Sequence, residues 1–338
     1  MVLIGVDPHK ASHTAVAIDG DEHQLARLLV RADRCQTDRL LAWAASFDER
    51  TWAIESAGGL GCLLAQQLVA AGETVLDVPA TLSARVRVLG SGRASKNDEN
   101  DALATAIAAL RHPRLRVVTA EDHAAVCRLL GDHYQDLSGL RTQAICRLHA
   151  LLRALVPGGA ARDLQAKRAS IVLRAVRPVT AINVERKRLA LELVADVRRL
   201  DRELVATKAR IVVAVATAKT SVTDVYGVGP IVAALIIGHT GDVRRFPSRN
   251  HYASYNGTAP IEASSGPKSR HRLNPRGNRQ LNHALHMAAV TQIRNDTPGR
   301  AYYRRKIDEG KTAKEAMRSL RRRISDAVYH QLVADADR

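Results

Sequence analysis

VLIGVD at residues 2–7 and TAVAI at residues 14–18 are short runs of β-branched and small apolar residues. That composition is typical of buried strands. Asp19-Gly20 follows the second run directly and predicts a hairpin turn into a third strand near residues 23–30. The chain is therefore expected to open with three antiparallel strands.

Strands and helices alternate after this opening. The pattern predicts strands at 51–56 and 74–78, and helices at 37–47, 60–71, 81–89 and 98–111. Three antiparallel strands followed by right-handed βαβ units predict a mixed sheet with helices on its faces. This element order is typical of ribonuclease-H-like domains, so an α/β domain is expected at 1–115.

The rest of the chain is expected to be mainly helical, with a helical or coiled-coil spacer at 116–218 and a C-terminal domain at 219–338. Within the spacer, residues at 4-3-4-3-4 spacing indicate a coiled-coil seam of a spacer or dimerisation arm. They are Leu193, Val197, Leu200, Leu204, Thr207 and Ile211. Because fewer than three heptads are present, an ordinary amphipathic helix in a bundle explains the pattern equally well.

Charge is distributed unevenly along the 338 residues, whose formal net charge is +17. Residues 1–110 hold 10 basic and 14 acidic side chains, and residues 111–338 hold 41 and 20. A basic surplus of that size indicates a polyanionic partner, most often nucleic acid. A basic membrane-surface helix is the weaker alternative, because the basic residues are spread over loops and several helices. Aromatic residues make up only 3%, so contacts with phosphates are expected rather than base stacking.

The compartment and any membrane association are also expectations from sequence. The N-terminus lacks a basic leader, and no run approaches about 18 uncharged apolar residues. The four cysteines are scattered without a CxxC pair, which supports neither a disulfide framework nor a zinc site. A cytoplasmic protein with no membrane partner is expected.

The C-terminal region contains a turn, Gly227-Val-Gly229-Pro230, directly before an apolar helix at 231–238. Backbone amides at such a helix start bind anions, and the pattern is typical of a helix-hairpin-helix that holds a DNA phosphate. Gly-Pro turns before helices are also common in proteins that bind no DNA. The following stretch, 256–280, reads as a loop, and its cationic side chains can line a nucleic-acid backbone. These are Lys268, Arg270, Arg272, Arg276 and Arg279.

The expected topology brings four carboxylates together in the first domain. Asp7 and Glu55 lie near the ends of strands, and Asp98 and Asp101 share one face of a helix. Such a cluster suits Mg²⁺ or Mn²⁺, which activate attack at a phosphodiester. Each acid also has a structural explanation: Asp7 before Pro8 can simply end a strand, and Ser95-x-x-Asp98 resembles a capping box.

Several motifs, in order, resemble a known family. GVDPHK at 5–10, AIESAGG at 53–59 and SKNDENDALATA at 95–106 look like the three acidic motifs of the DEDD transposases of the insertion-sequence-110 family. GVGPIVAALI and the later APIEASSGPKSRHRLNPRGNRQLNHAL resemble the C-terminal transposase domain of that family. The resemblance runs from about residue 3 to residue 333. One departure is Asn97, where the family pattern has Thr or Ser.

The resemblance implies a DNA recombinase with a RuvC-like domain. It implies an Asp-Glu-Asp-Asp metal site at Asp7, Glu55, Asp98 and Asp101. It also implies a nucleophilic serine at Ser265, with Ser264 as the neighbour that can be confused with it. The implied reaction is a transient phosphoserine link to DNA, strand exchange and resealing. Implied partners are target and donor double-stranded DNA, a structured guide RNA, and further copies of the chain in a homodimer or homotetramer.

Two other functions fit the same residues. A metal-dependent nuclease or Holliday-junction resolvase would use the same carboxylates with water as the nucleophile and would leave free ends. A non-enzymatic nucleic-acid-binding remnant of a mobile element would bind without cleaving. The intact set of acids makes the remnant the weakest of the three hypotheses.

Overall fold

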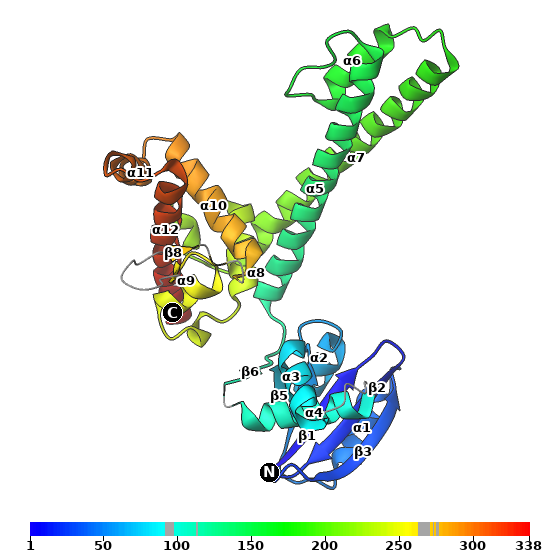
Figure 1. The fold of residues 1–338 in the computed structure, drawn as a ribbon, viewed down its shortest axis with the longest axis vertical. Helices are drawn as coiled ribbons and strands as arrows, with labels where there is room; N and C mark the ends of the chain where they lie inside the picture. Colours follow the sequence, from blue (N-terminus) through cyan, green and yellow to red (C-terminus); the bar gives the residue numbers. More distant parts are fainter. Residues whose placement is uncertain (92–97, 113, 263–270, 273, 275–276) are drawn as a thin grey trace. The chain divides into compact units, whose positions relative to one another are not determined.

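The computed structural model shown in Figure 1 describes residues 1–338 except 92–97, 113, 263–270, 273 and 275–276. The chain divides into two compact units, Met1–Glu121 and Asp122–Arg338. The finer division into three domains, with a boundary near residue 218, stays a prediction.

The first unit is built on a six-stranded mixed sheet with the order β3-β2-β1-β4-β5-β6. Its strands are β1 (Val2–Pro8), β2 (Ser12–Ile18), β3 (Gln24–Arg31), β4 (Arg50–Glu55), β5 (Val75–Val78) and β6 (Arg116–Val117). β1, β2 and β3 are antiparallel neighbours, whereas β4 runs parallel to β1 and β5 runs parallel to β4. This is the ribonuclease-H-like arrangement predicted from the element order. β6, a two-residue strand antiparallel to β5, was not predicted.

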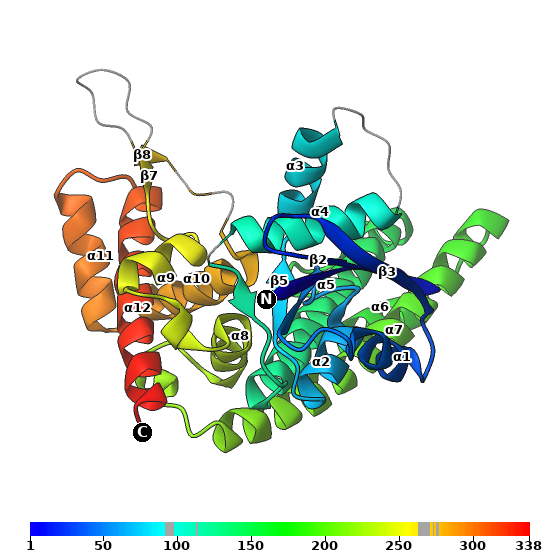
Figure 2. The ribbon, with the colours of Figure 1, turned by 90° about the horizontal axis from the view of Figure 1, so that it is seen from below.

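Helices cover both faces of this sheet, as Figure 2 shows. They are α1 (Gln36–Ala44), α2 (Cys62–Ala70), α3 (Ala80–Ser91) and α4 (Asp98–Arg111). Side chains alternate between the faces along β1. Ile4 and Val6 pack in a core with α1 and α2, and Leu3 packs in a second core with α3 and α4. Asp7, four residues after Leu3, therefore lies on the face that α4 covers.

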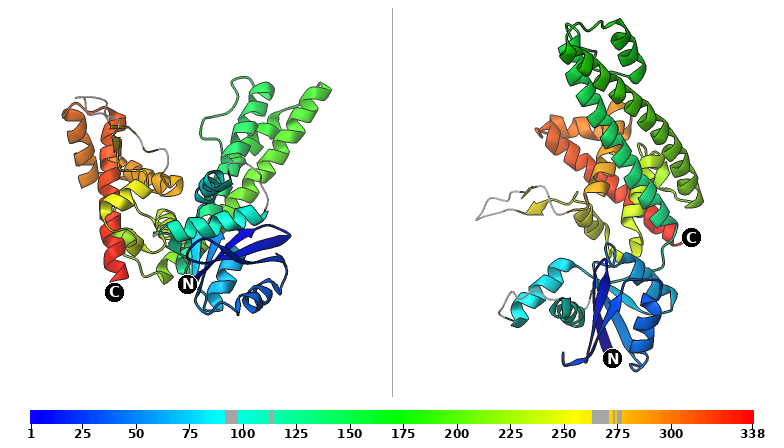
Figure 3. Two further views of the ribbon diagram at one scale, coloured as in Figure 1. Left: turned by 60° about the horizontal axis from the view of Figure 1, so that its bottom comes forward. Right: turned by 90° about the vertical axis from the view of Figure 1, so that its right-hand side faces the viewer.

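The second unit is almost entirely helical. Its elements are α5 (His123–Leu155), α6 (Ala166–Ala175), α7 (Ala181–Thr217), η1 (Val222–Asp224), α8 (Pro230–Thr240), η2 (Val243–Arg245), α9 (Arg249–Tyr255), β7 (Ile261–Glu262), β8 (His271–Arg272), α10 (Arg279–Arg294), α11 (Pro298–Asp308) and α12 (Ala313–Ala336). α5 and α7 lie side by side and form a long arm with α6 at its far end, as Figures 1 and 3 show. The unit has two apolar cores, one within the arm and one around α8, α10 and α12.

The predicted coiled-coil seam lies on α7. Val197, Leu200, Thr207 and Ile211 are buried, and α7 packs extensively on α5 of the same chain. An ion pair between Arg141 on α5 and Asp201 on α7 adds to this pairing, with a nitrogen–oxygen distance of 2.5 Å. The seam is thus occupied within the chain, as the bundle interpretation predicted.

The C-terminal region surrounds the apolar helix α8, in which residues 233–237 are all buried. The stretch expected to be a loop at 256–280 contains a short hairpin of β7 and β8, and α10 already begins at Arg279. Among the described residues, no helix combines the length and the apolarity needed to cross a membrane.

Candidate active site

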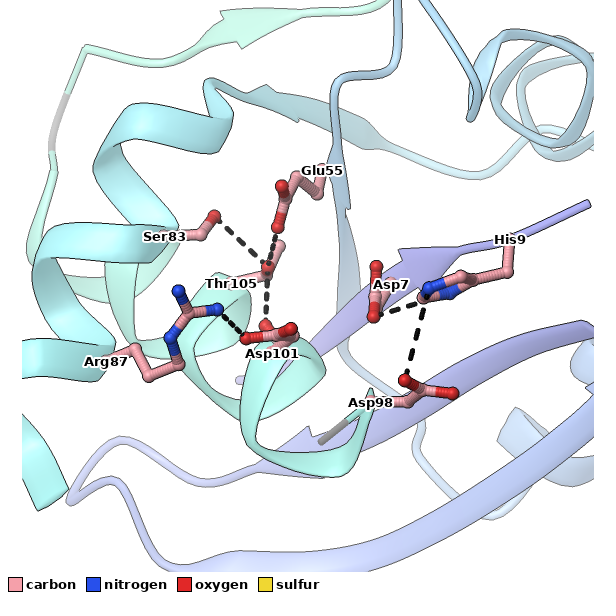
Figure 4. Close-up of polar contacts among 8 residues, drawn as sticks. All are labelled: Asp7, His9, Glu55, Ser83, Arg87, Asp98, Asp101 and Thr105. Atoms are coloured by element: carbon pink, nitrogen blue, oxygen red, sulfur yellow. Dashed lines mark hydrogen bonds and ion pairs between the residues drawn. The ribbon is translucent and has the colours of Figure 1, made fainter. Parts of the chain in front are cut away.

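The ends of β1 and β4 carry two of the four predicted acids. The two strands are parallel neighbours, with Val6 opposite Ile54. Asp7 and Glu55 are the next residues, and by alternation both side chains lie on the α4 face of the sheet. Figure 4 shows both carboxylates on this face. The sheet therefore places two carboxylates on adjacent strands, as the topology predicted.

The first turn of α4 carries the other two acids, Asp98 and Asp101. Asp101 is buried and lines a cavity of about 300 Å³ together with Asp7 and Glu55. Asp98 is not among the lining residues, and 57% of its side chain is exposed. Its Oδ1 lies 4.0 Å from His9 Nε2, and His9 Nδ1 lies 3.5 Å from Asp7 Oδ2. The structure thus places three acids around one cavity and links the fourth to Asp7 through His9.

A glycine allows α4 to lie this close to the sheet. A Cβ on Gly5 would be 2.1 Å from the carbonyl oxygen of Ala102 and 2.6 Å from the amide nitrogen of Ala106. Real Cβ atoms do not approach so closely, so only glycine fits between β1 and α4. Because Gly5 precedes Asp7 by two residues, this close approach brings the α4 acids to the strand end.

Burial and neighbouring carboxylates raise the pKa values of Asp7 and Glu55. Burial raises the pKa of Asp7 to about 6. The nearby His9 lowers this pKa, whereas the charges of Glu55, Asp101 and Asp98 raise it further. Burial and the charge of Asp101 also raise the pKa of Glu55. These acids destabilise one another when ionised, so the group favours a bound cation.

Polar neighbours hold the acids in place. The Thr105 hydroxyl donates to the backbone oxygen of Asp101 at 2.8 Å and lies 3.2 Å from Ser83 Oγ and 3.5 Å from Glu55 Oε2. Arg87 Nη1 forms an ion pair with Asp101 Oδ1. Figure 4 shows this set around the two carboxylates. The contacts limit how far Glu55 and Asp101 can turn.

The side chains fit a hard divalent cation. Asp7 Oδ2 is buried and has no hydrogen-bond partner among the described residues. One ligand atom each from Asp7, His9 and Asp98 lies within 4.8 Å of the others. Carboxylate oxygens are the ligands that Mg²⁺ and Mn²⁺ prefer. The side chains present at this site therefore fit a divalent metal ion.

Sequence reasoning did not assign roles to His9, Arg87, Ser83 or Thr105. His9 stands two residues after Asp7 within a quoted motif, and Thr105 stands four residues after Asp101 on the same helix. Both spacings were visible signals. Arg87 gave no such signal, because only the packing of α3 on α4 brings it to Asp101.

The predicted glycine turn lies between η1 and α8. Gly227 has φ +88°, and a Cβ there would be 2.7 Å from the carbonyl oxygen of Ala288. Gly229 is the N-cap of α8, Pro230 is the first helical residue, and a Cβ on Gly229 would meet open space. The element before the turn is the single 3₁₀ turn η1. The helix-hairpin-helix therefore stays a prediction, while the turn before α8 is present.

The predicted serine loop is largely outside the described residues. Ser264, Ser265, Lys268, Arg270 and Arg276 all lie in the stretches that the structure does not describe, as do Ser95 and Asn97 of the third acidic motif. Arg272 lies in β8, and Arg279 is exposed in the first turn of α10 after the N-cap Asn278.

Comparisons with known protein sequences agree over most of the chain. A DEDD-type IS110 model described as transposase matches residues 4–157, and a model described as transposase IS116/IS110/IS902 family matches residues 219–304. The chain is 28% identical over 377 residues to a 44.8 kDa protein of insertion element IS116 from Streptomyces clavuligerus, covering 98% of this chain and 94% of that protein. It is also 28% identical to a 42 kDa protein of insertion element IS900 from Mycobacterium paratuberculosis, covering 98% and 95%.

Two solved structures each cover about a third of this chain. The RuvC chain of Thermus thermophilus in complex with a Holliday junction substrate matches 35% of this chain and 99% of its own length, with 20% identity and a TM-score of 0.28. The RuvC structure of the same organism without a named substrate gives the same TM-score at 19% identity.

Proposed function

The chain belongs to the IS116/IS110/IS902 family of transposases, and on that premise we propose that Asp7, Glu55, Asp98 and Asp101 form the metal-dependent site at which it cuts DNA. The observation that carries this proposal is that Asp7, Glu55 and Asp101 line the same cavity. The family relationship makes the protein a DNA transposase, an enzyme that cleaves and rejoins DNA strands.

The acids act first as ligands. When bound, Mg²⁺ or Mn²⁺ offsets the negative charge of a phosphodiester and favours attack on its phosphorus. Asp7 and Glu55 supply oxygens from the sheet, and Asp101 supplies oxygens from α4. Thr105 keeps the start of α4 in register with Glu55, and Arg87 holds Asp101 by their ion pair. The geometry of the site is thereby set before DNA arrives.

Ser265 is the proposed nucleophile, with Ser264 as the alternative. Its Oγ would form a bond to phosphorus, the bond from phosphorus to a DNA oxygen would break, and that oxygen would take a proton and leave as a hydroxyl. Attack by another DNA hydroxyl on the phosphoserine would reverse these changes and release the serine. Each phosphoserine resolved in this way rejoins one DNA strand without net hydrolysis.

The basic residues of the second unit are proposed to hold nucleic acid. Gly229 would let a phosphate approach the start of α8, and Gly227 gives the preceding turn its positive φ. The cations of the following region would line a strand. These are Lys268, Arg270, Arg272, Arg276 and Arg279. The few aromatic residues support phosphate contacts and the delegation of sequence reading to a structured guide RNA. A homodimer or homotetramer would allow acids of one copy to act with the serine of another.

The nucleophile is tested by trapping the covalent intermediate. In the wild-type protein, Mg²⁺ and DNA carrying the native locus should give a protein–DNA adduct that survives SDS. Ser265→Ala should abolish the adduct and recombination while DNA binding stays within about twofold, and Ser264→Ala should retain both. An adduct in Ser265→Ala contradicts the serine assignment. Free hydrolysed ends without any adduct favour the resolvase hypothesis, and binding without cleavage favours the non-enzymatic remnant.

The guide is tested separately. The protein, purified from cells that carry its native locus, is expected to retain one discrete RNA after a high-salt wash, encoded beside its own reading frame. Bulk cellular RNA alone would contradict the guided mechanism and leave the metal site unaffected.

A further inference from the structure

A second cavity, of about 520 Å³, lies entirely within the second unit. Its walls come from α11, α12 and the segment 257–260 that leads into β7. α11 and α12 pack on each other, and Figure 2 shows them side by side. None of the residues named in the proposed function lines this cavity.

The cavity has a surplus of positive charge. Its lining includes five cationic side chains, Lys311, Arg318, Arg321, Arg322 and Arg323. Two carboxylates also line it, and both are already engaged. Glu315 Oε2 accepts from the Thr312 backbone amide at 2.9 Å in the capping box of α12, and Asp326 Oδ1 pairs with Arg322 Nε at 3.0 Å. The carboxylates therefore leave most of the cations uncompensated.

Arg321 is the clearest case of an uncompensated cation. Its Nε is buried and has no hydrogen-bond partner among the described residues, and its Nη2 reaches only the Asn282 carbonyl oxygen at 3.4 Å. Burial and the nearby Arg318 charge lower the pKa of Arg321. A guanidinium in such a place is destabilising until an anion pairs with it.

The other free cations point to the same conclusion. Arg318 is exposed on α12 and forms no ion pair with any residue in the described ranges. The guanidinium of Arg323 lies 5.7 Å from the ring centre of Tyr302, a contact that orients the side chain without neutralising it. The planar donors of arginine match the oxygens of a phosphate group better than a single point charge does.

We propose that this cavity binds a phosphodiester group of the DNA strand on which the transposase acts. The inference rests on the proposed function, because the neighbouring segment leads to the proposed nucleophile. Pro260 lines the cavity and stands five residues before Ser265, a stretch that an extended chain spans in at most about 18 Å. A phosphate held here would anchor the strand within a few nucleotides of the attacked bond.

Binding of a labelled 40-base-pair duplex by the full chain tests the cavity. Arg318→Gln and Arg321→Gln should each weaken binding about tenfold in 0.1 M salt and reduce the slope of log Kd against log salt by about one. Arg304→Gln is the matched control, because it removes the same charge from an exposed position on α11 outside the cavity. The control should change binding by less than about twofold.

Arg318 is exposed, so Arg318→Gln should keep the fold. Arg321 is half-buried, so melting curves check that Arg321→Gln is folded. Arg321→Lys should restore part of the DNA binding that Arg321→Gln loses. Binding by Arg318→Gln equal to that of Arg304→Gln overturns the cavity assignment and leaves the proposed metal site standing. The cavity assignment is also overturned if the arginine variants lose binding to structured RNA but bind the DNA duplex as the wild type does. The assignment to DNA is also overturned if inorganic phosphate raises the melting temperature of the wild type but not that of Arg318→Gln, while the two proteins bind DNA equally well. Wild-type protein that binds no DNA overturns both proposals.

Discussion

The Cα of Gly5 and the carbonyl oxygen of Ala102 are so close that a Cβ on Gly5 would lie 2.1 Å from that oxygen. This contact sets the distance between β1 and α4. Since Asp7 follows Gly5 on the strand and Asp101 precedes Ala102 on the helix, the same contact brings two of the acids to one cavity.

Gly5→Ala should therefore separate β1 from α4. We expect a loss of about 1–3 kcal/mol in the free energy of unfolding and a larger loss of DNA cleavage, because Asp101 moves away from Asp7. Thermal melting and cleavage assays measure the two effects. Gly20→Ala, at a turn where a Cβ meets nothing within 4 Å, is the control and should change neither. Equal behaviour of the two variants would show that the close contact is unimportant.

Asp7→Asn should stabilise the metal-free protein. The pKa of Asp7 is raised from 3.8 to about 6 in the folded state, so between these pH values the folded chain binds more protons than the unfolded chain. The wild type therefore loses stability as the pH rises from 4 to 6, and the variant lacks the part of this loss that Asp7 causes. Above pH 6 the variant should be more stable by up to about 3 kcal/mol, and at pH 4 the difference should disappear. Denaturant melts at several pH values measure it, and Asp48→Asn, at an exposed position, should show no such trend.

Glu73 should stabilise the first unit at neutral pH. It pairs with Arg50 at 2.5 and 3.0 Å and accepts from Trp52 Nε1 at 2.7 Å. The hydrogen bonds from Arg50 are the largest cause that lowers the pKa of Glu73, and the hydrogen bond from Trp52 lowers it further. Burial of the Glu73 carboxylate acts in the opposite direction and raises this pKa. The stabilisation that Glu73 provides is thus fully present above the pKa that Glu73 has in the unfolded chain. It is lost as the pH falls through the lower pKa that Glu73 has in the folded chain. Glu73→Gln should cost about 2 kcal/mol at pH 7 and less at pH 3, as measured by denaturant melts. An equal cost at both pH values would contradict this origin.

The two glycines of the turn before α8 should behave differently. Gly227→Ala should destabilise the second unit by about 1–3 kcal/mol, because φ is +88° and Ala288 leaves no room. Gly229→Ala meets open space and should leave melting unchanged. If a DNA phosphate approaches the backbone here, Gly229→Ala should still weaken duplex binding several-fold. Unchanged binding in that variant would argue against the helix-hairpin-helix.

Local patterns in the sequence predicted the part of the site that strand geometry determines. Asp7 and Glu55 end neighbouring strands, so alternation and strand order were enough to bring them to one face. Asp98 and Asp101 share a helix face by their spacing, yet their different exposure follows from how α4 lies on the sheet. That placement depends on Gly5, whose role becomes visible only when both elements are in position.

Other features could not be predicted because distant segments create them. Arg87 reaches Asp101 only through the packing of α3 on α4. The seam on α7 was visible, but its partner α5 was not, because a periodic pattern does not name the surface that covers it. The cationic cavity joins residues 257–260 to residues 311–326, and no local motif connects these stretches.

The measurement that bears most directly on the metal-dependent site is cleavage of DNA carrying the native locus, in Mg²⁺, by Glu55→Gln and by Glu49→Gln. The two variants remove the same charge, but Glu49 has 85% of its side chain exposed, whereas Glu55 lines the cavity. We expect Glu55→Gln to lose cleavage by at least about 100-fold while it binds DNA as the wild type does, and we expect Glu49→Gln to cleave normally. Cleavage by Glu55→Gln at the wild-type rate would contradict the proposed metal-dependent site.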